Sequence, residues 1–197
     1  MTVRERRERE RADRRRRIVD TARELAETEG WGAVTARRLA EAIEYSQPVL
    51  YSHFAGMESI IRAVALQGFV ELAAELAQVR VVGGPPTRQL YAVAHAYVEF
   101  GVDQPALYEA MFVRVTELAF GSSQAPEPLQ RAFAELRGVI EELAGEGDSE
   151  SDTEVFWSAL HGLVLLARSR RIRTDERGQP LDPLLTRLSL LWASPSS

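Results

Sequence analysis

The chain has 197 residues, of which 45% are hydrophobic and 27% are charged. This composition is typical of a folded globular protein with a sizeable core and excludes a disordered chain. The absence of cysteine excludes disulfides, thiolate metal sites and a cysteine nucleophile. No apolar run has the length of a membrane span, and the N-terminal residues lack the apolar stretch of a signal peptide. We therefore expect a cytoplasmic protein with no membrane partner.

The net charge of −5 hides an uneven distribution of charge. Residues 1–17 contain nine arginines and four acids, whereas residues 18–58 contain three arginines and seven acids. All 24 basic residues are arginines, which suit bidentate phosphate contacts better than lysines do. Residues 1–13 form an Arg-rich arm for which two interpretations stay open. The arm either follows DNA or is a solvated helix with ion pairs such as Arg4–Glu8, Arg6–Glu10 and Asp13–Arg17.

Helical periodicity dominates the chain, and no strand-like alternation bounded by hairpin turns is found. The first helix is predicted from Arg14 to Glu29, with an apolar face that begins at Ile18. Thr35 is expected to cap a second helix over residues 36–43. Ser46 is expected to cap a third helix over residues 47–54, with Pro48 in its first turn.

The remaining helices are longer. A connecting helix is predicted over residues 57–82, and the Gly-Pro stretch after it is the best candidate for a linker. Residues 85–193 are expected to form one helical domain with helices over 87–101, 105–117, 129–144, 152–170 and 182–193. Ser151 and Glu154 fit a capping box at the start of the fourth of these helices. The prediction is an all-α fold of about nine helices, in which residues 14–56 form a separate N-terminal domain.

The spacing of the second and third helices is that of a helix-turn-helix, in which one helix braces and the next lies in the DNA major groove. The third helix combines small or polar residues at its start with apolar residues, Leu50 and Phe54, that would face the brace. Gln47 could pair with adenine and Val49 could contact a thymine methyl group. The other predicted DNA contacts are Ser46, Pro48 and Ser52 on the same helix, Tyr51 and His53 to phosphates, and Arg37 and Arg38 at the start of the bracing helix.

Three segments carry a family resemblance, namely IVDTARELAETEGW, VTARRLAEAI and SQPVLYSHF. Together with their spacing, they make residues 14–66 resemble the N-terminal domain of TetR-type transcriptional regulators. The resemblance implies base contacts around Gln47, Pro48 and Val49, and phosphate contacts from Thr35, Tyr51 and His53. Two positions depart from the family pattern. Glu44 stands where the turn usually has glycine, and Met57 stands where a phosphate-binding lysine is usual.

The segments PALYEAMF at 105–112 and FWSALHGLVLL at 156–166 resemble an effector domain with a Trp-x-x-x-His-Gly signature, found in some of these regulators. The resemblance implies a helical ligand-binding and dimerisation domain. An aromatic-rich helical domain can line an apolar cavity for a small-molecule effector. The candidate pocket residues are Tyr91, His95, Tyr108, Met111, Phe112, Trp157 and His161. Most of these aromatics, and His161, are also consistent with ordinary core positions.

A single short helix reads few bases, so a homodimer on a palindromic, double-stranded operator is expected. The last two long helices carry enough apolar surface to form a four-helix bundle with a partner chain. The predicted seam consists of Leu160, Leu163, Val164, Leu188 and Leu191. An effector bound in the C-terminal domain would change the tilt of the connecting helix and thereby release the operator.

Enzyme chemistry has little support. Ser158 and His161 lie three residues apart on one helix, but no acid is placed to orient the histidine. The chain contains three histidines, which are scattered and show no metal-ligand spacing, and there is no phosphate-binding glycine loop. We predict no catalytic residue, metal or cofactor. A regulator without a ligand, and a helical small-molecule-binding protein or enzyme with no DNA role, remain alternative functions.

Overall fold

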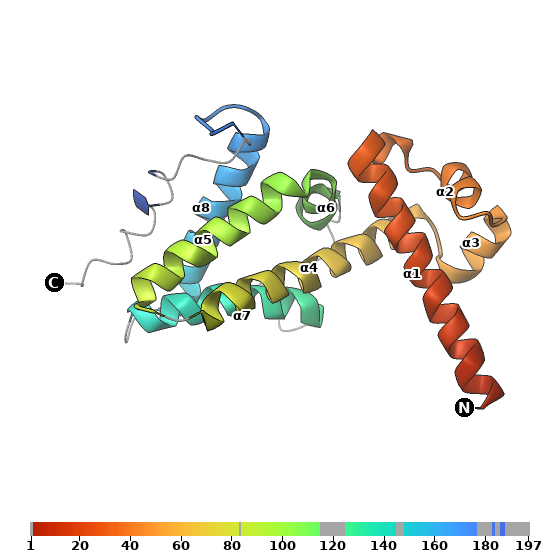
Figure 1. The fold of residues 1–197 in the computed structure, drawn as a ribbon, viewed down its shortest axis with the longest axis horizontal. Helices are drawn as coiled ribbons and strands as arrows, with labels where there is room; N and C mark the ends of the chain where they lie inside the picture. The colour runs from red at the N-terminus through yellow and green to blue at the C-terminus, as the bar shows by residue number, and fades with distance from the viewer. Residues whose placement is uncertain are drawn as a thin grey trace. The chain divides into compact units, whose positions relative to one another are not determined.

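The computed structural model describes residues 2–82, 84–114, 125–144, 148–176, 183 and 186–187. The all-α fold is confirmed, since the described residues form eight α-helices, one 3₁₀ turn and one π-helical turn (Figure 1). No helix in these ranges is long and apolar enough to cross a membrane. The last expected helix, over residues 182–193, lies almost entirely outside them. The α-helices are α1 Val3–Glu29, α2 Ala36–Ala42, α3 Gln47–His53, α4 Met57–Val81, α5 Pro86–Asp103, α6 Pro105–Glu109, α7 Glu127–Ala144 and α8 Ser149–Arg168.

The chain divides into two compact units. The described part of the first comprises residues 2–68 and 106–114, and that of the second comprises residues 69–82, 84–105, 125–144, 148–176, 183 and 186–187. These units differ from the domains expected from sequence, because the boundary falls within α4 and because residues 106–114 join the N-terminal unit.

Helix α1 begins about three turns earlier than predicted. A reciprocal capping box starts it, in which Thr2 Oγ1 accepts the backbone N–H of Glu5 and the Glu5 carboxylate accepts that of Thr2. Residues 2–17 are all exposed, and burial begins at Ile18. Figure 1 shows this N-terminal part of α1 extending past α2 and α3. The arm is therefore helical and carries the expected pairs Arg4–Glu8 and Arg6–Glu10, while Asp13 pairs with Arg16 rather than with Arg17. Whether it also follows DNA stays a prediction.

The turn between α2 and α3 keeps a regular helix ending without the usual glycine. The N–H of Tyr45 donates to the carbonyl of Ala40 at 2.9 Å, and the N–H of Glu44 donates to that of Glu41 at 3.2 Å. This is a Schellman motif, whose left-handed position favours glycine. Glu44 occupies that position with φ 58°. The departure from the family pattern at Glu44 thus results in backbone strain rather than in a different turn.

Residues 106–114 belong to the first unit through contacts with α1, the 3₁₀ turn Trp31–Ala33 and α4. The indole N–H of buried Trp31 donates to the carbonyl of Ala106 at 2.8 Å. Gly68 allows α4 to approach Leu107 and Met111, because a Cβ atom at this position would lie 2.5 Å from Met111 Sδ. After α6, the chain continues as the π-helical turn Ala110–Arg114, where a regular helix to residue 117 was expected.

The second unit packs α5, α7 and α8 against one another, with the C-terminal part of α4 contributing to its core. Helix α8 begins at Ser149, because Asp148 caps it by accepting the N–H of Ser151. The predicted capping box at Ser151 and Glu154 was therefore wrong. Arg80 of α4 pairs with Glu135 of α7 at 2.7 Å and with Glu142 at 3.6 Å. The side chains with no exposed surface include Leu76, Leu90, Val139, Ile140 and Phe156.

Candidate nucleic-acid interface

Helix α3 has one exposed side and one buried side. Ser46, Gln47, Pro48 and Val49 are all exposed at its N-terminal end. On the other side Leu50 has no exposed surface, and Phe54, which follows the helix, is 3% exposed. The helix therefore presents small and polar side chains while two apolar anchors hold it against α1 and α2, as a helix that enters a major groove must do.

Side-chain hydrogen bonds restrict what some of these residues can do. Ser46 occupies the N-cap position of α3, but its hydroxyl makes no capping bond. The Ser52 hydroxyl donates to the carbonyl of Val49 at 2.6 Å, so its oxygen remains as an acceptor. Tyr51 is 49% exposed and keeps its phenol available for an external acceptor.

The predicted phosphate contacts on α2 differ in availability. The Thr35 oxygen accepts the N–H of Arg38, which leaves the hydroxyl hydrogen for a phosphate. Arg37 is exposed and lies 3.7 Å from Glu41 on the next turn of the helix. Arg38 instead pairs with Glu29 at 2.6 Å. Arg37 is therefore the freer of the two cations.

Arg15 fixes the C-terminal end of α3 to α1. Its guanidinium lies 4.0 Å from the centre of the Phe54 ring, and Nη1 donates to the carbonyl of His53 at 2.8 Å. A cation at this end of a helix satisfies a free carbonyl and offsets the negative end of the helix dipole. This role was not predicted from sequence because the two partners are 38 positions apart in the chain.

His53 lies in a strongly positive environment. Partial burial is the main cause that lowers its pKa below the ordinary value, and the positive charges of Arg11, Arg14 and Arg15 lower it further. Its Nδ1 atom is buried and has no hydrogen-bond partner among the described residues. An anion at this end of α3 would relieve the repulsion, because it would favour the charged imidazolium.

The residues predicted to line a ligand pocket fall into both units. Tyr108 and Met111 have no exposed surface and belong to the first unit, where Tyr108 contacts Phe112 with ring centres 4.6 Å apart. In the second unit, Trp157 donates its indole N–H to the Tyr97 hydroxyl at 2.9 Å and contacts His161. Burial lowers the pKa of His161. Tyr91 and His95 contact each other on α5 with ring centres 6.2 Å apart.

The predicted dimer seam needs correction on α8. Leu160 and Val164 have no exposed surface within their own chain, so neither offers area to a partner. Leu163 is partly exposed. The large exposed apolar side chains of α8 are Val155, Leu165 and Leu166. Leu188 and Leu191 lie outside the described residues.

Two family profiles match the chain. "Bacterial regulatory proteins, tetR family" covers residues 18–64, which contain α2 and α3. "Tetracyclin repressor-like, C-terminal domain" covers residues 90–188, about half of the chain.

Curated relatives and solved structures agree with these profiles. The chain is 33% identical over 98 residues to the uncharacterized HTH-type transcriptional regulator YobS of Bacillus subtilis, a match that covers 50% of this chain and 51% of that protein. It is 29% identical over 153 residues to the uncharacterized HTH-type transcriptional regulator Rv0681 of Mycobacterium tuberculosis, covering 77% of this chain and 69% of that protein. The match thus spans about half the length of the first relative and about two thirds of the second.

The crystal structure of RolR in complex with its ligand resorcinol has the same fold, with a TM-score of 0.65, 18% identity, and coverage of 95% of this chain and 91% of that one. At this identity the likeness shows the fold alone. An N-terminal and a C-terminal family profile, two curated relatives and a helix-turn-helix with an exposed second helix lead to one conclusion. The chain belongs to the tetR family of bacterial regulatory proteins, which are transcriptional regulators with a helix-turn-helix and not enzymes.

Proposed function

We propose that this protein is a ligand-responsive repressor that binds a palindromic operator as a homodimer and is released by a small molecule. The observation that carries the proposal is the exposure of Ser46–Val49 on a helix whose opposite side is anchored by Leu50. Because bacterial DNA lies in the cytoplasm, the protein acts there.

The N-terminal end of α3 reads the DNA sequence. The carboxamide of Gln47 matches the donor and acceptor pair of adenine in the major groove, and the Val49 methyl groups match the thymine methyl. Both side chains are exposed, and Val49 keeps 37% of its surface accessible. Pro48 and Ser46 are small enough to let the helix approach the base edges.

Phosphates are held on either side of this end. Thr35, Tyr51 and Arg37 are exposed and carry hydrogen-bond donors, and such contacts set the register of the protein without reading sequence. His53 contributes at the far end of α3, where it is surrounded by arginines. Arg38 mainly stabilises the fold, because it forms an ion pair with Glu29.

Two copies bind together, since half-sites one helical turn apart require two reading helices about 34–36 Å from each other. The exposed apolar side chains of α8, Val155, Leu165 and Leu166, supply the surface for a two-fold seam. An apolar patch of this kind on a surface helix is typical of a protein interface.

The effector binds in the second unit. Tyr91 and His95 on α5, and Trp157 and His161 on α8, combine aromatic surface with polar tips, which is the chemistry of a site for a small amphipathic or aromatic molecule. RolR, which shares the fold, binds resorcinol. The effector releases DNA only to the extent that it binds the DNA-free state more tightly than the DNA-bound state.

The experiment is a gel-shift titration of the purified protein against the DNA upstream of its own gene, repeated at several salt concentrations. We expect binding that exceeds binding to random DNA and weakens steeply with salt, because phosphate contacts release counterions. Equal binding to the upstream and random duplexes would contradict a sequence-specific regulator. Addition of small aromatic compounds then tests release.

A further inference from the structure

Arginines line one face of the exposed part of α1. In an α-helix each residue turns by about 100°, so residues three and four positions apart share a face. The buried stripe of α1 runs through Ile18 and Ala22. Continued toward the N-terminus in steps of three or four residues, this stripe passes through Arg14, Arg11, Arg7 and Arg4. The positions that would carry apolar residues if another protein element covered this face are therefore all arginines.

The two faces of this segment differ in charge. At about 100° per residue, Arg4, Arg7, Arg11, Arg14 and Arg15 lie within about 60° of the line through Ile18, and no acid does. Glu8 and Glu10 lie at the two edges of this strip, about 80° from the line, and the rest of the helix surface combines four arginines with Glu5 and Asp13. The strip along the line thus carries only positive charges.

The arginines at the centre of the stripe are free of acids. Arg4 pairs with Glu8 at 2.9 Å, but no ion pair of Arg7, Arg11 or Arg14 is found in the part of the chain that the structure describes. All three are exposed. A surface charge of one sign without counter-charges is an electrostatic footprint for a polyanion.

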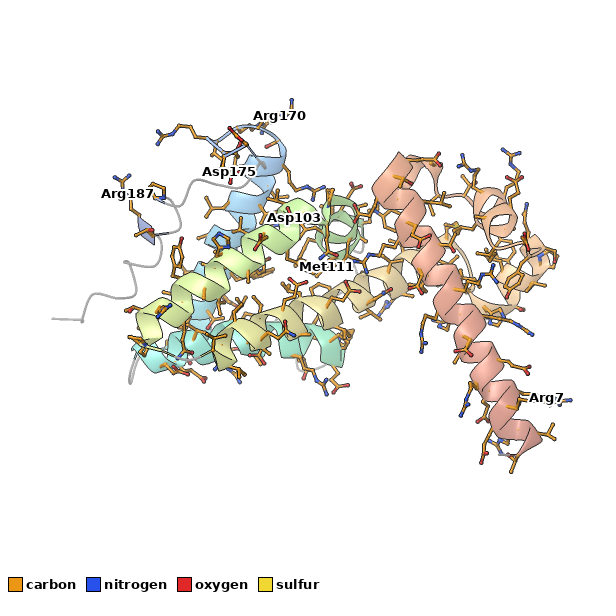
Figure 2. All side chains as sticks on the ribbon, in the orientation of Figure 1. Arg7, Asp103, Met111, Arg170, Asp175 and Arg187 are labelled. Carbon is orange, nitrogen blue, oxygen red and sulfur yellow. The ribbon has the colours of Figure 1, made fainter. Side chains whose placement is uncertain are left out.

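The stripe continues the candidate nucleic-acid interface. Arg15 holds α1 to the end of α3 through Phe54 and the carbonyl of His53. The labelled side chain of Arg7 leaves α1 on the side where α2 and α3 lie (Figure 2). The positive potential of Arg11 and Arg14 reaches His53, where it contributes to the lowered pKa. The arginine face of α1 therefore points to the same side as α3, the helix that carries the predicted base contacts.

We infer that the Arg4–Arg14 stripe of α1 binds the DNA backbone outside the half-site that α3 reads, and so lengthens the footprint of each bound chain. From Arg4 to Arg14 the helix rises about 15 Å, at 1.5 Å per residue. At 3.4 Å per nucleotide along a strand, this reach spans about four base pairs. The inference rests on the proposed function, because it requires that α3 bind DNA.

The test compares two triple variants with the same change in net charge. Arg7→Gln/Arg11→Gln/Arg14→Gln removes the stripe, and Arg6→Gln/Arg9→Gln/Arg16→Gln removes three arginines from the opposite face. The probe is a duplex of about 40 base pairs, selected by the wild-type protein from a random-sequence library, and a second duplex trimmed by about five base pairs at each end. Circular dichroism shows whether the variants keep their helix content.

On the long duplex we expect the stripe variant to bind at least about tenfold more weakly, and its plot of log Kd against log salt to be less steep by about 2–3 per bound chain, since each phosphate contact contributes about 0.9. Its hydroxyl-radical footprint should be shorter by about four base pairs at each outer edge. The opposite-face variant should bind like the wild-type protein. On the trimmed duplex, the stripe variant and the wild-type protein should have similar affinities.

Equal losses in both triple variants, or an unchanged footprint in the stripe variant, would overturn the inference while leaving the proposed function intact. Failure of the wild-type protein to select any duplex would overturn both. The two failures are therefore distinguishable.

Discussion

The carboxylate of Glu27, near the end of α1, accepts the backbone N–H of Leu107 at 2.9 Å. It also accepts the N–H of Ala106 at 3.1 Å. Both groups lie in the first turn of α6, where a helix has no internal acceptor for them, and a negative charge there favours the helix dipole. Glu27 thus caps a helix that begins about 80 positions further along the chain.

Glu27→Ala should lower the free energy of unfolding by about 2 kcal/mol, because it leaves two partly buried N–H groups without an acceptor. Urea denaturation followed by circular dichroism measures this. Glu24→Ala is the matched control, since Glu24 is exposed on the same helix, and it should change stability by less than about 0.5 kcal/mol. A loss of similar size in both variants would show that the cap contributes nothing specific.

Gln47→Ala should weaken binding to the selected operator by about 1–3 kcal/mol and leave binding to random DNA unchanged, because only a base contact carries sequence information. Arg37→Ala should weaken binding to both duplexes by a similar factor and reduce the salt dependence, because a phosphate contact is independent of sequence. Fluorescence anisotropy with the two duplexes separates the cases. Equal losses on both duplexes for Gln47→Ala would refute its reading role.

DNA binding should depend on the protonation of His53. In the free protein, burial and then Arg11, Arg14 and Arg15 lower the pKa of His53, whereas a nearby phosphate raises it. Binding therefore takes up protons. The resulting gain in affinity is complete below the pKa of the free protein and is lost as the pH rises through the pKa of the complex.

The dissociation constant should accordingly increase as the pH rises from below the lowered pKa of His53 in the free protein to above its higher pKa in the complex, and more steeply for the wild-type protein than for His53→Gln. Isothermal titration calorimetry in buffers of different ionisation enthalpy counts the protons taken up. Parallel pH profiles for the two proteins would exclude His53 as the group that titrates.

Glu44→Gly should raise the free energy of unfolding by about 0.5–1 kcal/mol, because glycine adopts a left-handed conformation without a steric cost. Glu44 holds a φ of 58° in the turn between α2 and α3. Glu44→Ala removes the charge but keeps the strain, so it should give no such gain. A gain of equal size in both variants would assign the effect to the charge. Thermal unfolding of the three proteins decides between them.

Gly68→Ala should destabilise the protein by about 1–3 kcal/mol, although alanine is the better helix former, because the core must move to admit the methyl group. The new Cβ would lie 2.5 Å from Met111 Sδ and 2.9 Å from Leu107 Cδ1, both in fully buried side chains. Gly162→Ala on α8 is the control, because a Cβ atom there would meet no other atom within 4 Å. It should stabilise by up to about 1 kcal/mol. Stabilisation in both variants, measured by urea denaturation, would show that the approach of α4 to residues 107–111 is not tight.

Capping residues and helical periodicity, which depend only on neighbouring residues, predicted helix α3 well. The cap at Thr35 is confirmed, because capping depends on residues next to each other in the chain. Ser46 occupies the N-cap position of α3 as expected, but its hydroxyl makes no capping bond. The inward placement of Leu50 and Phe54, and the exposure of Gln47 and Val49, follow from helical periodicity. These features needed no information from distant residues.

Features that depend on distant partners were not predicted. No local pattern indicates that Trp31 donates to Ala106, 75 positions away, or that residues 106–114 join the N-terminal unit. The early start of α1 was missed because an all-polar segment has no hydrophobic periodicity, although Thr2 and Glu5 form a capping box. Leu160 and Val164 were assigned to a seam because apolar residues alone do not distinguish an intrachain core from an interface.

The contacts of Glu27 and Trp31 with residues 106 and 107 bear on how an isolated DNA-binding fragment of this protein should be designed. A fragment that ends before residue 84 would contain every predicted DNA contact but would lack residues 106–114. The Trp31 indole would then lose its acceptor, and Gly68 would lose its contacts with Leu107 and Met111. Minimal operator-binding versions of this protein should therefore be built with residues 105–114 grafted back, rather than by truncation.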